Sequence, residues 1–248
     1  MKVSIITVVF NNKETIKDAI LSVYEQTYKN VEHIIIDGGS TDGTKEILEK
    51  ERDKFAILVS ESDKGIYDAM NKGVLMATGD VIGILNSDDL YADNMVLQDV
   101  VSCFAGGSGL SIVYGDLVYV KSDNTNNIVR KWMSKPYYDC FFENGNVPPH
   151  PTLFLRNNIY KEVGLFDLEF KLAADYELML RIFKKHDFKS RYIRKVIVKM
   201  RLGGATNQSF LNIKNQNLEI LKAWRKNNLS LPLFLMVFRF FKRLNQFL

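Results

Sequence analysis

The sequence has few cysteines and histidines, the residues that stabilise many small folds through disulfides or metal sites. It contains two cysteines, Cys103 and Cys140, which lie far apart in a chain of 248 residues. Its three histidines, His33, His150 and His186, do not have the spacing of metal ligands. A disulfide framework and a structural zinc site are therefore not indicated. With 46% hydrophobic and 25% charged residues, the chain instead has enough apolar material for a large core.

Long hydrophobic runs are missing near both ends of the chain. Met1 and Lys2 lead directly into the strand-like run VSIITVVF, so a secretory signal is not expected and the cytoplasm is the default location. Near the other end, the apolar run from Leu229 to Phe238 is far shorter than the roughly 20 residues that span a bilayer. No transmembrane helix is therefore expected.

Acidic residues are absent from the last part of the chain. Residues 220–248 contain six basic side chains and no acidic one. The other 219 residues carry 27 basic and 29 acidic side chains, so their net charge is −2 although the whole chain has +4. A nucleic-acid-binding protein would spread Lys and Arg over a binding face, and this chain does not, so no nucleic-acid partner is expected.

Strand-like and helix-like segments alternate through the first half of the chain. Apolar runs that suit buried strands occur at 3–10, 31–37, 55–60 and 80–89. Apolar stripes at helical spacing lie between them, at 16–24 and at 66–77. This alternation predicts an α/β, Rossmann-like fold, in which helices cover both faces of a mainly parallel sheet. Such sheets bind ligands beyond the carboxyl ends of their strands.

Two glycine-rich nucleotide motifs are missing from this predicted sheet. The first strand-to-helix turn reads VVFNNKET, without the G-x-G-x-x-G that lets backbone approach a pyrophosphate, and no P-loop is present. Their absence argues against a dehydrogenase and against a P-loop enzyme. It favours a nucleotide site that handles a diphosphate through a metal ion.

Two adjacent carboxylates, Asp88 and Asp89, end the fourth strand-like run, DVIGILNSDD. Neighbouring like charges at a buried strand end are costly unless a cation shares them. Carboxylate oxygens favour Mg²⁺ or Mn²⁺, which keep open positions for water and substrate phosphates. The alternative is that the pair caps the next helix, because Asp suits the positive end of a helix dipole.

Five motifs, in order, resemble the family 2 glycosyltransferases of GT-A fold, of the bacterial surface-polysaccharide type. They are SIITVVFNN, IIIDGGSTDGT, SDKGIYDAMNKG, GILNSDD and AADYELMLR. The resemblance covers roughly Val3 to Arg181. It implies that the nucleoside of a donor UDP-sugar is held by Thr7, Asn11 and Asp37. A second reading makes Asp37 only a turn-former before two glycines.

The resemblance also assigns Asp88 and Asp89 to the donor sugar and to the metal, Mn²⁺ or Mg²⁺. Many relatives have a further Asp where this chain has Asn86, so which carboxylate ligates the metal directly stays open. Lys64, in the turn after the third strand, either faces the nucleotide or sugar or is a solvated turn residue.

The second half of the chain is expected to form the acceptor side. SIVYGDLVYV and IVRKWM suit antiparallel or edge strands, and the proline-rich segment around His150 is extended or turning. His150 resembles a family position near the acceptor or the phosphates, or it is a structural hydrogen-bonder. A helix at 172–186 places Asp175 in its first turn. The resemblance implies that Asp175 is the general base of an inverting transfer, with Glu177 as a supporting acceptor-side residue.

Arg201 stands in the loop MRLGGATN, 200–207, which either closes over the diphosphate or is a plain strand-to-helix turn. Residues 1–205 are predicted to form the glycosyltransferase domain, with a nucleotide-sugar half at 1–110 and an acceptor half at 111–205. Residues 206–248 are predicted to form a helical, basic and hydrophobic extension.

A helix in the tail would be amphipathic. Its basic face would carry Arg239, Lys242 and Arg243. Its apolar face would carry Phe234, Val237, Phe241, Leu244 and Leu248. One reading docks the apolar face on an anionic membrane at the inner surface of the cell. The other packs the helix on the body with its basic side in water.

Together these features predict an inverting transferase that moves a hexose or N-acetylhexosamine from a UDP-sugar to a glycan or lipid-linked acceptor. Two alternatives stay open at this level. One is a metal-dependent nucleotide-sugar hydrolase or nucleotidyltransferase, and the other is a non-catalytic, membrane-associated UDP-binding protein.

Overall fold

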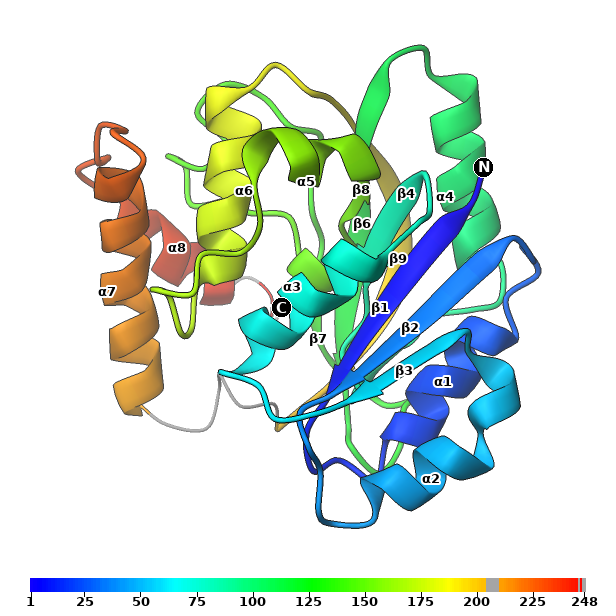
Figure 1. The fold of residues 1–248 in the computed structure, drawn as a ribbon. Coiled ribbons are helices and arrows are strands. Elements are labelled where there is room, and N and C mark those ends of the chain that lie inside the picture. Colours follow the sequence, from blue (N-terminus) through cyan, green and yellow to red (C-terminus); the bar gives the residue numbers. More distant parts are fainter. Residues whose placement is uncertain (204–209, 245, 247–248) are drawn as a thin grey trace.

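The structure is a computed structural model that describes residues 1–203, 210–244 and 246. Among these residues, nine strands form one sheet in the order β3-β2-β1-β4-β8-β6-β9-β5, and β7 pairs with β6 beside this path. Figure 1 shows the sheet running through the molecule, with α1 and α2 on one side of the first strands and α3 on the other. The predicted α/β architecture is confirmed.

The strands are β1 (Val3–Val9), β2 (Val31–Asp37), β3 (Ile57–Ser60), β4 (Val81–Ile84), β5 (Asp89–Tyr91), β6 (Leu110–Val120), β7 (Ile128–Trp132), β8 (Phe154–Arg156) and β9 (Lys189–Arg201). The helices are α1 (Ile16–Tyr24), α2 (Thr44–Lys50), α3 (Ile66–Met76), α4 (Val96–Gly106), α5 (Asn157–Val163), α6 (Ala174–Lys185), α7 (Phe210–Lys226) and α8 (Leu235–Leu244). Short 3-10 turns occur at Arg52–Lys54 and His150–Thr152.

The first half of the sheet is parallel, as its sequence pattern predicts. β1 pairs in parallel with β2 and with β4, and β2 pairs in parallel with β3. Every residue of β1 is buried, because helices cover both faces of this part of the sheet. The carboxyl ends of β1 and β2 therefore reach the same edge, where a ligand site is expected.

The second half of the sheet is mixed, which agrees with the expected antiparallel strands. β6 pairs antiparallel with β7 and β8, and it pairs in parallel with β9. β8 joins the two halves because it also pairs antiparallel with β4. The strands of the second half thus belong to the same continuous sheet as those of the first half.

The fourth strand is shorter than the run DVIGILNSDD suggests. β4 ends at Ile84, and a turn follows in which the Asp89 amide donates to the Asn86 carbonyl at 3.1 Å. Asp89 then begins β5, which pairs antiparallel with β9. The next helix, α4, begins only at Val96. The reading of the Asp pair as a helix cap is therefore wrong.

The C-terminal helices pack against α6. Ile220, Ala223 and Trp224 of α7 are buried in the same core cluster as the apolar face of α6, and Leu235 of α8 joins them. The predicted boundary at 205/206 lies outside the described residues. None of the helices in the described part of the chain has the length and hydropathy to span a bilayer.

Candidate active site

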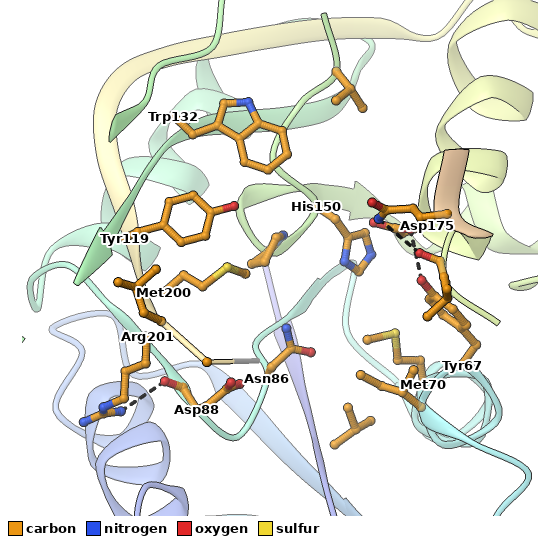
Figure 2. Close-up of a pocket in the computed structure, with 18 of the residues that line it drawn as sticks. Tyr67, Met70, Asn86, Asp88, Tyr119, Trp132, His150, Asp175, Met200 and Arg201 are labelled. Carbon is orange, nitrogen blue, oxygen red and sulfur yellow. Dashed lines mark hydrogen bonds between the residues drawn. The ribbon is translucent and has the colours of Figure 1, made fainter. Parts of the chain in front are cut away.

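A large cavity, with a volume of about 1420 Å³, opens at the carboxyl end of β1. Its walls come from the β1–α1 turn, the turn after β4, the start of α3, strands β6, β7 and β9, the start of α6 and the inner side of α8. Lining residues include Phe10, Asn11, Gly38, Asp63, Tyr67, Asn86, Asp88, Tyr119, Arg130, Trp132, His150, Asp175, Arg201, Arg239 and Arg243. Figure 2 shows Asp88 and Arg201 on one side of this cavity, and His150 and Asp175 on the other.

The acidic turn after β4 places its two carboxylates differently. Asp88 faces the cavity, whereas Asp89 is fully buried behind it. Burial raises the pKa of both carboxyl groups, and the charge of Asp88 raises that of Asp89 further. Asp89 Oδ2 accepts a hydrogen bond from Asn86 Nδ2 at 3.1 Å, but its Oδ1 is buried and has no hydrogen-bond partner among the described residues. Such a charge is costly unless a cation compensates it.

The acidic turn after β4 fits a hard divalent cation, provided that substrate oxygens complete the coordination. Besides Asp89 Oδ1, the amide oxygen of Asn86 is buried and has no hydrogen-bond partner in the described part of the chain. Across the described ranges, no three His, Cys, Asp or Glu side chains form a complete metal cluster. Mg²⁺ usually takes only one or two carboxylates and completes its shell with water and phosphate oxygens. Asp88 is the carboxylate that reaches the cavity, so it is the better placed direct ligand.

Arg201, the last residue of β9, stabilises the acidic turn after β4. Its side chain is almost fully buried, and Nη1 donates to the Asp88 carbonyl oxygen at 3.1 Å. Nη2 forms an ion pair with Asp18 of α1, while Nε is buried without a hydrogen-bond partner. Arg201 therefore places a positive charge beside the acidic turn. The remainder of its predicted loop, 204–207, lies outside the described residues.

Asp175 lies across the cavity, in the first turn of α6 as the sequence predicts. Its Oδ1 accepts a hydrogen bond from the Tyr67 hydroxyl at 3.0 Å. Burial and the charge of Asp175 raise the pKa of Tyr67, so the phenol keeps its proton and remains a donor. The hydrogen bond joins α6 to α3 and fixes one oxygen of a carboxylate that lines the cavity.

His150 faces Asp175 across the same end of the cavity (Figure 2). Its ring packs edge-on against Phe166, with 5.6 Å between the ring centroids. Burial lowers the pKa of the imidazole, although the nearby charge of Asp175 acts in the opposite direction. A neutral imidazole can both donate and accept one hydrogen bond, so His150 can orient a hydroxyl group.

Glu177 does not line the cavity, although it is only two residues from Asp175. Its carboxylate is buried, accepts from Arg181 Nε at 2.8 Å and accepts from Asn227 Nδ2 at 2.9 Å. These bonds tie α6 to the end of α7. The contacts of Glu177 stabilise the packing of the helices, and we assign it no role in catalysis.

The expected nucleoside residues are divided between the cavity and the core. Asn11 lines the cavity with a positive φ of 49°, and its Oδ1 accepts from the Thr41 amide at 2.8 Å. Thr7 is fully buried and bonds to His33 Nε2 at 2.9 Å. Lys64 lines a separate pocket of only about 30 Å³.

Asp37 is also fully buried, and it accepts hydroxyl hydrogen bonds from Ser40 and Ser60 at 2.5 Å each. Besides Asn11, the groups that reach the cavity at this edge include Phe10, Gly38 and Asp63. Asp63 lies close to the Gly38 backbone, because a Cβ at Gly38 would be 2.5 Å from its Oδ2. Sequence reasoning quoted this residue within a motif but gave it no role.

The orientation of α8 differs from one of the two predicted arrangements, in which the helix packs on the body with its basic side in water. Arg239, Lys242 and Arg243 of α8 line the cavity, so the basic face does not project into water. The signal that could have revealed this was the spacing of Arg239 and Arg243, which places both on one face of a helix. It could not reveal which surface that face would meet, since this depends on how α8 folds back over the sheet.

Comparison with known proteins identifies the family. The model of the family described as "Glycosyl transferase family 2" matches residues 4–164. An uncharacterized glycosyltransferase of Mycobacterium tuberculosis is 34% identical over 182 residues, which cover 72% of this chain and 68% of that protein. A PGL/p-HBAD biosynthesis glycosyltransferase of Mycobacterium bovis is 28% identical over 208 residues, which cover 82% of this chain and 78% of that protein.

Solved structures share the fold at low sequence identity. A fragment of S. aureus TarS in complex with UDP-GlcNAc has a TM-score of 0.68 and 16% identity, over 91% of this chain and 73% of that chain. The mannosyltransferase PcManGT from Pyrobaculum calidifontis, in complex with GDP-Man and Mn²⁺, has a TM-score of 0.66 and 17% identity, over 96% of this chain and 68% of that chain. The fold is thus the expected GT-A type. From the family match and these relatives, the chain belongs to glycosyl transferase family 2 and is a glycosyltransferase.

Proposed function

We propose that the protein transfers a hexose or N-acetylhexosamine, with inversion, from a UDP-sugar to a glycan or lipid-linked acceptor in surface polysaccharide or glycolipid synthesis. One observation carries this proposal. The same cavity is lined by Asp88 on one wall and by Asp175 on the opposite wall. A diphosphate bound at the first wall would direct its sugar toward the second, where a base meets the attacking hydroxyl.

Asp175 is the proposed general base. The Tyr67 hydrogen bond holds one of its oxygens, and the cavity gives an acceptor access to the carboxylate. The acceptor hydroxyl would pass its proton to Asp175 while its oxygen attacks the anomeric carbon and UDP leaves. No covalent bond to the enzyme forms, because a single displacement inverts the anomeric centre. His150 would orient the acceptor hydroxyl.

The donor would bind at the edge formed by β1 and the acidic turn. Asn11 and the Phe10 to Gly38 edge face the nucleoside, with Asp37 and Thr7 supporting that edge from the core. Two solved neighbours, by their titles, bind UDP-GlcNAc and GDP-Man with Mn²⁺. When bound at Asp88, with Asp89 behind it, Mn²⁺ or Mg²⁺ would offset charge on the leaving diphosphate. Arg201 would add a fixed positive charge to the same end.

The acceptor side supports a lipid surface as partner. The outer side of α8 leaves apolar side chains about half exposed, namely Phe234, Val237, Phe238, Phe241 and Leu244. Exposed apolar groups gathered on one helix, beside basic side chains, suit docking on an anionic membrane. One relative is named for PGL/p-HBAD biosynthesis. We therefore place the enzyme at the inner face of the cell membrane.

The test is acceptor-dependent UDP release. The protein is incubated with UDP-glucose, UDP-galactose, UDP-GlcNAc or UDP-GalNAc and Mn²⁺, with and without lipid-linked saccharide acceptors, and the anomeric configuration of the product is read by NMR. We expect UDP release that requires the acceptor and a product of inverted configuration. UDP release without acceptor would indicate a hydrolase instead. UDP binding without turnover for every donor would indicate a binding protein.

A further inference from the structure

Helix α8 brings a cation to the Asp175 end of the cavity. The Arg239 guanidinium lies over the ring of Tyr176, the residue after Asp175, with Cζ 5.0 Å from the ring centroid. Beyond the end of α8, Gln246 accepts a hydrogen bond from Arg130 Nε of β7 at 2.7 Å. The inner side of α8 therefore runs along the cavity wall, from the start of α6 toward β7.

Arg239 is compensated only in part by the groups around it. Among the described residues its Nε is buried without a hydrogen-bond partner, and its guanidinium lies against the ring of Tyr176. Burial lowers the pKa of Arg239 and the charge of Arg243 acts in the same direction, whereas the nearby charge of Asp175 raises it. Because the pKa is lowered overall, the Asp175 charge does not replace all of the lost solvation, and a ligand with further negative charge would stabilise the cation.

Close backbone packing fixes the position of Arg239. Gly145, with a φ of 74°, touches α8 so closely that a Cβ there would lie 2.7 Å from the Arg239 nitrogen. Leu235, one turn earlier, is almost fully buried in the core. The approach of Arg239 to the cavity is therefore built into the fold and does not depend on a flexible tail.

The location of Arg239 separates it from the donor end. Arg201 lies against Asp88, whereas Arg239 lies against the neighbour of Asp175. The opposite side of α8 is apolar and exposed through Phe234, Val237 and Phe241. A ligand that meets both sides of this helix would carry a negative group into the cavity and a hydrocarbon chain outside it.

We propose that Arg239 binds a phosphate group of the acceptor, and that the acceptor saccharide is carried on a lipid through a phosphate or diphosphate. This inference rests on the proposed function, since it names the acceptor class of the same cavity. The guanidinium would hold the phosphate in a bidentate manner, and the saccharide would extend from it to the base. Arg239 is thus a specificity-determining residue for the acceptor.

Direct binding tests the inference without turnover. Isothermal titration measures the affinity of the full chain, saturated with UDP and Mn²⁺, for octyl diphosphate, inorganic pyrophosphate and uncharged octyl glucoside. We expect octyl diphosphate to bind most tightly. Arg239→Gln should weaken that binding about 10- to 100-fold, the range for hydrogen bonds to a charged group. Arg239→Lys should lose less, because the charge remains without the fork geometry.

The matched control is Arg225→Gln, which removes an equal charge from the exposed side of α7. It should leave octyl diphosphate affinity unchanged, and all variants should bind UDP as the wild type does. Equal affinity of Arg239→Gln and wild type for octyl diphosphate would overturn the inference. A parallel loss of UDP affinity would assign Arg239 to the donor. Should Arg239→Gln not fold, the comparison of Arg239→Lys with wild type decides.

The three titrated compounds distinguish the possible sources of the phosphate. The results also distinguish failure of this inference from failure of the proposed function. If pyrophosphate binds as tightly as octyl diphosphate, the lipid part of the inference is wrong. If octyl glucoside binds as tightly, the phosphate part is wrong. Failure to transfer sugar from any donor would refute the proposed function but not this binding site. Transfer to phosphate-free acceptors, with equal KM in wild type and Arg239→Gln, would refute the site but not the function.

Discussion

At the scale of single residues, the chemistry depends on two carboxylates with different surroundings. Asp175 is reached from the cavity and is held by one hydrogen bond from Tyr67. Asp88 faces the cavity from a turn that a hydrogen bond from Arg201 stabilises. Because one carboxylate is proposed to take a proton and the other to hold a cation, neutral substitutions should separate their roles.

Asp175→Asn should lose sugar transfer by roughly 10² to 10⁴-fold, the usual contribution of a positioned general base. The amide accepts the Tyr67 hydrogen bond but cannot take a proton, so UDP affinity should stay within about twofold. Initial rates and UDP titrations measure the two effects. Asp123→Asn, in an exposed loop, is the control. Transfer at the wild-type rate would remove Asp175 from the base role.

Asp88→Asn and Asp89→Asn should both raise the Mn²⁺ concentration that gives half-maximal activity. Loss of an outer-shell partner typically costs 10- to 100-fold in metal affinity, and we expect Asp89→Asn in this range. Asp88→Asn should cost more, because its oxygens are the ones that reach the cavity. Metal titrations of the transfer rate give both values. The reverse order would make Asp89 the direct ligand, and unchanged titrations would refute a metal at this turn.

At the scale of elements, α8 has two dissimilar sides and each meets a different environment. Arg239 and Arg243 face the cavity, while the phenylalanines on the other side are exposed. Removing the whole helix would also remove a wall of the cavity. Point substitutions on the outer side are therefore the sharper test of membrane docking.

The double variant with Phe234→Ser and Phe241→Ser should co-sediment at least about tenfold less with vesicles containing anionic lipid, because two aromatic anchors are lost. UDP affinity should not change. The control is Leu75→Ser on α3, since Leu75 is 73% exposed but lies outside the tail. Binding of the wild type should also weaken at high salt. Equal sedimentation of the double variant and the wild type would argue against docking through α8.

At the scale of the whole molecule, a buried histidine links stability to pH. His33 of β2 is almost fully buried, and burial lowers its pKa to about 3. The unfolded chain has a histidine pKa of about 6.5. Because the folded pKa is lower, the unfolded state binds more protons below pH 6.5. Stability from neutral His33 is therefore complete above that pH and is lost as the pH falls toward 3.

Between pH 7.5 and pH 5, this difference should cost the wild type about 2 kcal/mol of unfolding free energy. His33→Gln cannot titrate but can still bond to Thr7, so its loss over the same interval should be smaller by about that amount. Urea unfolding at both pH values measures the difference. Equal pH dependence of the two proteins would contradict the prediction that burial keeps His33 neutral in the folded state.

The sequence alone determined the main elements of the first half of the chain and their order. The apolar spacing of Ile16 to Tyr24 and of Ile66 to Met76 predicts α1 and α3, and the buried run Val3 to Val9 predicts β1. It also predicts that Asp175 starts a helix. These features depend on local periodicity and on the side chains of neighbouring residues, which a single sequence contains.

Only the tertiary structure decided which of these residues share the cavity. Glu177 and Asp175 are two residues apart, yet one is tied to Arg181 while the other meets a ligand space, because successive positions on a helix point in different directions. Arg239 is far from Asp175 in the chain, and the two residues come near each other only because α8 packs against α6. Such contacts depend on long-range packing, which local pattern does not specify.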